Sequence, residues 1–286
     1  MLNMKKILLS IAVVAASASA VNAQKYEYED GSAAEAPGHH QRRHGGTSTE
    51  DLRFGAYFAP AIAWMHPTTG KSDNGLYSVS SEGSKLGYSW GLLMDYYFAD
   101  NYALATGFNL TTGGGIISTQ YVGPGATGRT YATSTVYASK FNYNLQYLEV
   151  PFNLKLRSDE LGQQGIRVFG QLGVTVGFNL AHKANYTVQY SDSTGSVLSE
   201  ASGNNEKLKG TLTVPPVIFS LNVGGGAEYP ITDKMSIYAG IFFNNGFAPD
   251  ATNPGNYDGI GMGYLGSFKD GNTRLNNFAI RIGILF

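Results

Sequence analysis

The chain ends in Phe278-Ala279-Ile280-Arg281-Ile282-Gly283-Ile284-Leu285-Phe286, and this stretch decides the fold. Side chains alternate between two faces along a β-strand, so the large apolar residues share one face and Arg281 lies on the other. One face suits hydrocarbon and the other suits a polar interior. We expect this last strand to close a sheet by pairing with the first strand near Arg53–Phe58. The apolar face consists of Phe278, Ile280, Ile282, Ile284 and Phe286.

The composition favours the wall of a β-barrel over a soluble α/β enzyme. The 286 residues include 37 glycines, and 13% of the chain is aromatic while only 14% is charged. Glycine at this level lies well above its average of about 7%. A net charge of −1 gives no electrostatic reason to expect nucleic acid as a partner. Because the chain has no cysteine, disulfides and cysteine-ligated metals are excluded, and we expect no cofactor.

The N-terminus has the pattern of a cleaved secretory signal peptide. Lys5 and Lys6 precede an apolar run, Ile7–Ala16, and a small-residue stretch that ends at Ala23. This order of basic, apolar and small segments predicts a signal peptide over residues 1–23. The apolar run is too short for a transmembrane helix.

Residues 24–50 are polar and offer almost nothing apolar to bury, which predicts a disordered periplasmic leader. The leader contains His39, His40 and His44, but no cysteine or carboxylate stands at ligand spacing beside them. We therefore do not predict a metal site there.

From residue 51 to residue 286 the hydrophobic pattern has period 2, and eight segments show it. The predicted strands cover residues 51–65, 85–98, 102–112, 141–157, 165–180, 214–229, 234–245 and 278–286. Within 141–157 the apolar residues change parity, which predicts a bulge near Tyr147 or a strand that emerges into water there.

Short and long connections alternate, so they lie at opposite ends of the sheet. The long ones cover residues 66–84, 113–139, 181–213 and 246–273. This asymmetry is typical of an outer-membrane barrel with short periplasmic turns and long extracellular loops. The predicted fold is an all-β, eight-stranded, antiparallel, up-and-down transmembrane β-barrel over residues 51–286, located in the cell outer membrane.

Charged residues in the strands fall on the face opposite the large apolar ones, as expected when the apolar face meets lipid. An eight-stranded barrel is just wide enough for side chains to fill. We therefore predict that these charges pair with one another inside the lumen. The predicted network contains Arg53, Asp95, Glu149, Lys155, Arg167, Glu228 and Arg281. A soluble lipocalin-like barrel is the alternative, since period 2 alone does not tell inside from outside.

The chain shows no catalytic constellation. His66 and His182 are the only histidines after the leader, and they lie on strands that stand opposite each other in an eight-stranded ring. A non-enzymatic protein is expected.

The segment Tyr147-Leu148-Glu149-Val150-Pro151-Phe152-Asn153-Leu154-Lys155 resembles a strand of the PorT-like outer-membrane β-barrel family. Phe169-Gly170-Gln171-Leu172-Gly173 and Gly225-Gly226-Ala227-Glu228-Tyr229 are similar to that family too. The resemblance implies an eight-stranded outer-membrane barrel without catalytic residues. It also implies that the terminal aromatic strand is an assembly signal, read by the outer-membrane assembly machinery.

Three functions follow as expectations. The first is a structural or accessory surface protein with a filled lumen, whose partner is outer-membrane lipid. The second, which the resemblance implies, is a component of type IX secretion or gliding machinery that binds secretion-system proteins at the periplasmic face. The third is a narrow porin-like channel for small solutes.

Overall fold

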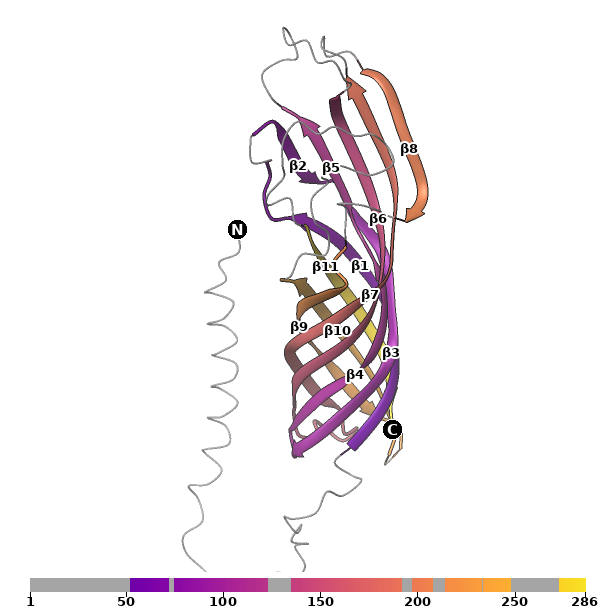
Figure 1. Cartoon of the computed structure of the whole chain (residues 1–286). Coiled ribbons are helices and arrows are strands. Elements are labelled where there is room, and N and C mark those ends of the chain that lie inside the picture. The colour runs from indigo at the N-terminus through magenta and orange to yellow at the C-terminus, as the bar shows by residue number, and fades with distance from the viewer. Residues whose placement is uncertain are drawn as a thin grey trace, which may run out of the picture. The chain divides into compact units, whose positions relative to one another are not determined.

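The described residues form eleven antiparallel β-strands (Figure 1). The structure is a computed structural model that describes residues 52–71, 75–122, 135–191, 197–207, 214–232, 234–247 and 273–286. The strands are β1 (Leu52–Pro67), β2 (Tyr77–Ser81), β3 (Ser84–Ala99), β4 (Tyr102–Gly113), β5 (Ile116–Tyr121), β6 (Thr135–Arg157), β7 (Arg167–Ser191), β8 (Val197–Lys207), β9 (Val217–Pro230), β10 (Ser236–Gly246) and β11 (Thr273–Leu285). Within these ranges there is no helix that is long and apolar enough to cross a membrane. The predicted signal peptide, 1–23, and leader, 24–50, lie outside the described residues.

Eight of the strands close into a ring. The order of hydrogen-bonded neighbours is β1-β3-β4-β6-β7-β9-β10-β11, and β11 pairs again with β1. At the seam, Phe54 N–H donates to the Phe286 carbonyl at 3.0 Å, and Phe286 N–H donates to the Phe54 carbonyl at 2.8 Å. Further along the seam Phe58 stands opposite Ile282. The predicted closure of the last strand against residues 53–58 is confirmed.

The three other strands correct the sequence prediction, because β2, β5 and β8 lie in stretches that the pattern predicted to be loops. They pair with one another or with prolonged ends of β6 and β7, and Figure 1 shows them beyond the ring. Their sequences are short or rich in Ser, Gly and Asn, so no apolar alternation marks them; pairing with a long neighbour stabilises them instead. We call β2, β5, β8 and residues 135–146 and 181–191 the extension.

Side chains exchange faces between the ring and the extension. In the ring part of β6, Phe152 faces outward and is 47% exposed, whereas Asn153 and Lys155 face inward and are buried. In the extension part of the same strand, Phe141 and Tyr143 are buried on the inner face. The ring is thus apolar outside and polar inside at this level, while the extension packs an apolar core as a water-soluble sheet does.

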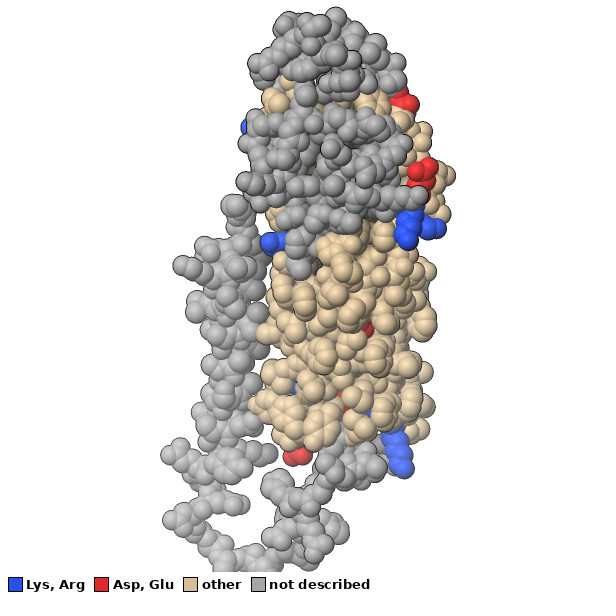
Figure 2. Space-filling model, viewed as in Figure 1, with Lys and Arg blue, Asp and Glu red and all other residues tan. Residues whose placement is uncertain are grey.

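Large apolar side chains cover the outside of the ring, and all eight ring strands contribute to them. Figure 2 shows this surface as a tan band with charged side chains gathered above and below it. We call these outward residues the belt. Its members include Phe54, Phe58, Ile62, Tyr88, Trp90, Leu92, Tyr96, Phe98, Leu104, Phe108, Phe152, Leu154, Val168, Leu172, Val174, Phe178, Leu180, Phe219, Leu221, Tyr229, Ile237, Ile241, Phe278, Ile280, Ile282, Ile284 and Phe286.

A register shift marks the change from ring to extension. Gln146 stands opposite Ala181, but the next residue, Tyr147, stands opposite Asn179, so Leu180 is the extra residue of a bulge. The predicted bulge near Tyr147 is therefore present in the β6–β7 ladder, and its extra residue belongs to β7. Along β6, the odd-numbered residues face inward on both sides of the shift. Along β7, the odd-numbered residues face inward before Leu180 and the even-numbered ones after it, because a single inserted residue moves all later side chains to the other face.

Pairing in the ring wall is interrupted at two described places, over Ala59–Pro60 in the β1–β11 ladder and between β4 and β6. Pairing is continuous over Tyr102–Ala105 and over Asn109–Gly113 but absent over residues 106–108. This register places Pro151 opposite Gly107, and proline has no N–H to donate to the ladder. The hydrogen-bonded ladder between β4 and β6 is therefore open at this point.

This interruption predicts a local difference in amide hydrogen exchange. Gly107 lies in the unpaired stretch, whereas Ala105 and Asn109 on either side of it are paired with β6. We expect the Gly107 amide to exchange at least tenfold faster than the amides of Ala105 and Asn109 in detergent-folded protein, measured by NMR. Equal protection of all three amides would contradict an open ladder at Pro151.

Candidate functional site

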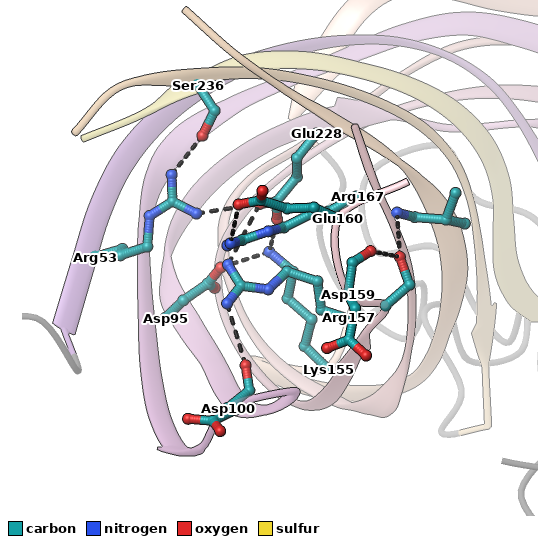
Figure 3. A network of polar contacts seen from close by, with 12 residues as sticks. Arg53, Asp95, Asp100, Lys155, Arg157, Asp159, Glu160, Arg167, Glu228 and Ser236 are labelled. Carbon is teal, nitrogen blue, oxygen red and sulfur yellow. Dashed lines mark hydrogen bonds and ion pairs between the residues drawn. The ribbon is translucent and has the colours of Figure 1, made fainter. Parts of the chain in front are cut away.

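The inside of the ring holds a cluster of buried charges with Lys155 at its centre (Figure 3). Lys155 Nζ lies 2.6 Å from Asp95 Oδ2 and 2.5 Å from Glu228 Oε1. All three residues are at most 4% exposed, and they come from β6, β3 and β9. Alternation along each strand directs these three side chains inward, and the register between the strands brings them to one level of the ring.

Two arginines complete the cluster on the other oxygen of Glu228. Arg53 Nη1 donates to Glu228 Oε2 at 3.1 Å, and its Nη2 donates to the hydroxyl of Ser236. Arg157 Nη1 lies 3.8 Å from the same carboxylate oxygen. Its Nη2 donates to the Asp100 carbonyl at 3.1 Å, and its guanidinium lies over the ring of Tyr97 at 4.2 Å. Each carboxylate in this cluster therefore has at least one cation within reach, as burial of charge requires.

The structure joins four of the seven predicted network residues, namely Arg53, Asp95, Lys155 and Glu228. It adds Arg157, which the predicted network omitted. The signal for Arg157 was present, because it has the same parity as Lys155 two residues earlier.

Arg167 is a correction to the predicted network. Its Nη2 donates to Glu160 Oε1 at 2.6 Å, in the turn between β6 and β7, and both side chains are partly exposed. Arg167 is the first residue of β7, and its side chain pairs with Glu160 of the turn and not with the Lys155 cluster.

Arg281 and Glu149 also face inward, but neither has an ion pair within 4 Å among the described residues. The Arg281 guanidinium lies over the rings of Phe242 at 4.1 Å and Tyr57 at 4.9 Å. Glu149 Oε2 accepts a hydrogen bond from Thr111 Oγ1 at 2.6 Å. The charge of Arg281 acts on Glu149 electrostatically, so these two residues form a second, looser part of the interior.

A row of side-chain amides crosses four neighbouring strands on the inner face. Gln171 donates to Asn222 at 2.9 Å, Asn222 donates to Asn244, and Asn244 donates to Asn277 at 2.8 Å. Period-2 alternation places Gln171 and Asn222 on the polar faces of their strands but gives no link between them. Adjacent strands place the four amides side by side, and this juxtaposition satisfies polar groups that would be costly if left unpaired.

The cavity beside the charge cluster is small. The interior cavity bordered by Lys155, Phe169, Tyr238, Phe242 and Arg281 has a volume of about 20 Å³. That is enough for about one water molecule. Side chains thus fill the ring at the level of the charge cluster.

The site offers paired charges but no arrangement of nucleophile and base. His182 Nδ1 lies 2.8 Å from Asn179 Oδ1, away from the charge cluster. Over the ranges that the structure describes, no group of three or more metal-ligating side chains occurs. What the geometry can do is hold eight strands in a fixed arrangement around a closed interior.

Comparison with known proteins gives a family match over more than half of the chain. A family model described as "Outer membrane protein beta-barrel domain" matches residues 41–213. No curated protein matches.

Several solved structures are similar in outline. Neisserial surface protein A is 14% identical, with 82% of this chain and 96% of that chain covered and a TM-score of 0.35. The outer membrane protein OprG from Pseudomonas aeruginosa is 12% identical, with 82% and 95% covered and a TM-score of 0.36. The outer membrane protease OmpT from Escherichia coli is 11% identical, with 83% and 96% covered and a TM-score of 0.33. At these TM-scores the family match, not the structural likeness, carries the assignment.

Removal of the central cation tests the cluster. Lys155→Met leaves Asp95 and Glu228 buried without their shared partner, which we expect to cost about 3–5 kcal/mol of unfolding free energy. Urea unfolding in lipid vesicles, followed by the fluorescence of Trp64 and Trp90, measures this loss.

The matched control is Lys234→Met, because Lys234 is exposed in the turn between β9 and β10. Its expected effect is within about 0.5 kcal/mol. Equal stability of the Lys155 and Lys234 variants would mean that the cluster does not stabilise the ring.

Proposed function

The chain belongs to the family of the outer membrane protein beta-barrel domain, and from this we propose that it is a non-enzymatic outer-membrane protein whose ring spans the bilayer with a filled lumen. The extension would then project from the membrane as a surface structure. The observation that carries the proposal is the exchange of faces: a ring that is apolar outside and charged inside continues into a sheet with the opposite arrangement. Hydrocarbon around the ring and water around the extension explain both.

Backbone pairing supports the same solvent assignment. In hydrocarbon every backbone N–H and C=O needs a partner inside the protein, so only closed sheets or helices can span. The closed ring has no end strand, whereas β2 and β8 are the end strands of the described sheet. Backbone groups of an end strand that no neighbour pairs are tolerated only where water can solvate them.

The connections support an orientation. β3–β4, β6–β7 and β9–β10 are joined by turns of at most nine residues, all at the end of the ring where Phe54 and Phe286 meet. The other connections are long, and three of them contain the strands of the extension. Outer-membrane barrels place short turns in the periplasm and long connections outside the cell, so the proposal places the extension on the cell surface.

Lipid exposure of the belt predicts a large penalty for a charge on it. Ile282→Lys, in the middle of the belt residues of β11, is expected to cost about 2–4 kcal/mol of unfolding free energy in vesicles. Leu161→Lys is the control, because Leu161 is equally exposed but lies in the β6–β7 turn. Similar costs at both positions, or a protein that needs no detergent and shows no heat-dependent shift on gels, would reject the membrane assignment.

The filled lumen predicts that the protein does not conduct. In planar lipid bilayers we expect no steady current steps under conditions in which a general porin, tested in parallel, opens readily. Steady open steps would overturn the filled-lumen proposal and favour the narrow channel.

Membership in the PorT-like subgroup, with a role in secretion or gliding machinery, is the second proposed function. The residues of the resembling segment hold special positions: Tyr147 lies at the register shift, Glu149 is bonded to Thr111, and Pro151 interrupts the wall. Deletion of the gene should then abolish export of secreted cargo, and unchanged export would remove this role.

A further inference from the structure

The outer face of β6, β7 and β8 presents three kinds of chemistry in order above the ring. The belt ends on β7 with Phe178 and Leu180, which are 43% and 54% exposed. Basic residues follow, and a groove lined by amides and hydroxyls lies beyond them. The first part is apolar, the second is basic and the third is polar without a net charge. A ligand that contacts all three would be an amphiphile with an acidic group and a polar head.

The basic level contains two lysines in direct opposition. Lys183 stands opposite Lys207 in the β7–β8 ladder, and both are exposed. Like charges directly opposite each other on neighbouring strands are unfavourable. Figure 2 shows basic side chains at the upper border of the tan band. An anion between the two ammonium groups would remove the repulsion.

The two described carboxylates of β8 have hydrogen-bond partners other than these lysines. Glu206 accepts the Tyr186 hydroxyl at 3.0 Å, and Glu200 accepts from Gln189 at 3.3 Å. Among the described residues, no ion pair within 4 Å involves Lys183 or Lys207.

Beyond the lysines lies a groove of about 490 Å³ on the same face. Its volume falls within the range of small-molecule sites. Residues from three adjacent strands supply polar side chains to it: Lys140, Asn142, Asn185, Thr187, Ser202 and Asn204. Apart from Lys140, these lining side chains carry amides or hydroxyls and no charge, which suits the hydroxyl groups of a saccharide.

The groove is held open and is not saturated by internal bonds. Lys140 pairs with Glu82 at 2.8 Å, and this hydrogen bond lowers the pKa of the Glu82 carboxyl. Asn185 Oδ1 accepts the Asn205 N–H at 2.7 Å. Asn205 has φ +53° beside a register shift of β8, so the strand bends there. Asn142 Oδ1 is buried without a hydrogen-bond partner.

We propose that this face binds a phosphorylated glycolipid of the outer leaflet. Its acyl chains would lie along Phe178 and Leu180, its phosphate between Lys183 and Lys207, and its sugars in the groove near Asn142. The inference rests on the proposed function, because it needs Leu180 in the bilayer and the groove above the membrane surface.

Native mass spectrometry of the detergent-folded protein, titrated with rough-type lipopolysaccharide, tests the proposal. We expect saturable binding that weakens at least tenfold in the double variant Lys183→Gln, Lys207→Gln. Dephosphorylated lipopolysaccharide should show a similar loss with the unaltered protein. The matched control is Lys71→Gln with Lys234→Gln, which changes the net charge equally at two exposed lysines elsewhere and should bind as the unaltered protein does.

A second pair of variants tests the sugar level. Thr187→Val with Ser202→Ala removes two groove hydroxyls and should weaken lipopolysaccharide binding about fivefold while leaving phosphatidylglycerol binding unchanged. The glycolipid proposal is overturned if the double-lysine variant binds normally. It is also overturned if phosphatidylglycerol binds as tightly as lipopolysaccharide, or if inorganic phosphate alone displaces the lipid.

Heat-dependent gel shifts separate this result from the broader proposal. Shifted bands together with absent or unaltered lipid binding reject the glycolipid site alone. Absence of the shift in the unaltered protein rejects the membrane assignment, and with it the premise of the site.

Discussion

Backbone groups in hydrocarbon must find every partner within the protein, and the rest of this structure depends on that requirement. The ladder between β1 and β11 serves this requirement, because it joins the first and last ring strands and so leaves the ring without an end strand. Closure also fixes which side chains face inward. Once the Phe54–Phe286 seam is made, the Arg281 side chain lies in the interior. Closure therefore buries charged side chains inside the ring, where each needs a favourable partner.

Inside the ring, several charged groups share the same ion-pair partner. Asp95 and Glu228 lie on opposite sides of Lys155, and Glu228 also receives Arg53 and Arg157. The looser upper part uses aromatic rings and amides instead, as Arg281 and the row from Gln171 to Asn277 illustrate. Such an interior leaves little free volume, and it couples strands that are distant in sequence. Stability and closure of the lumen thus have the same physical source.

In the extension the distribution of apolar and polar side chains is reversed, because the proposal places it in water and not in hydrocarbon. Above the register shift at Leu180, apolar side chains face inward and polar ones outward, and the described sheet has end strands, β2 and β8. The strands β6 and β7 run through both the ring and the extension, so each shows both arrangements along its length. The bulge in β7 and the unchanged parity of β6 show two ways to make that change: one strand shifts its side chains, and the other changes its residue types.

Alternation along the chain was sufficient to predict the ring strands, the pairing of Phe278–Phe286 with the first strand, and the inward side of Arg281, because period 2 is a local property of each strand. It could not predict that Lys155 meets Asp95 and Glu228 while Arg167 turns to Glu160, because relative height between strands depends on the register around the whole ring. Nor could it predict β8, whose residues carry no apolar pattern and form a strand only beside β7. In the ring strands the sequence by itself thus determined which side chains share a face, and the tertiary structure decided which side chains meet, since contacts across a ring are set by closure rather than by neighbours in the chain.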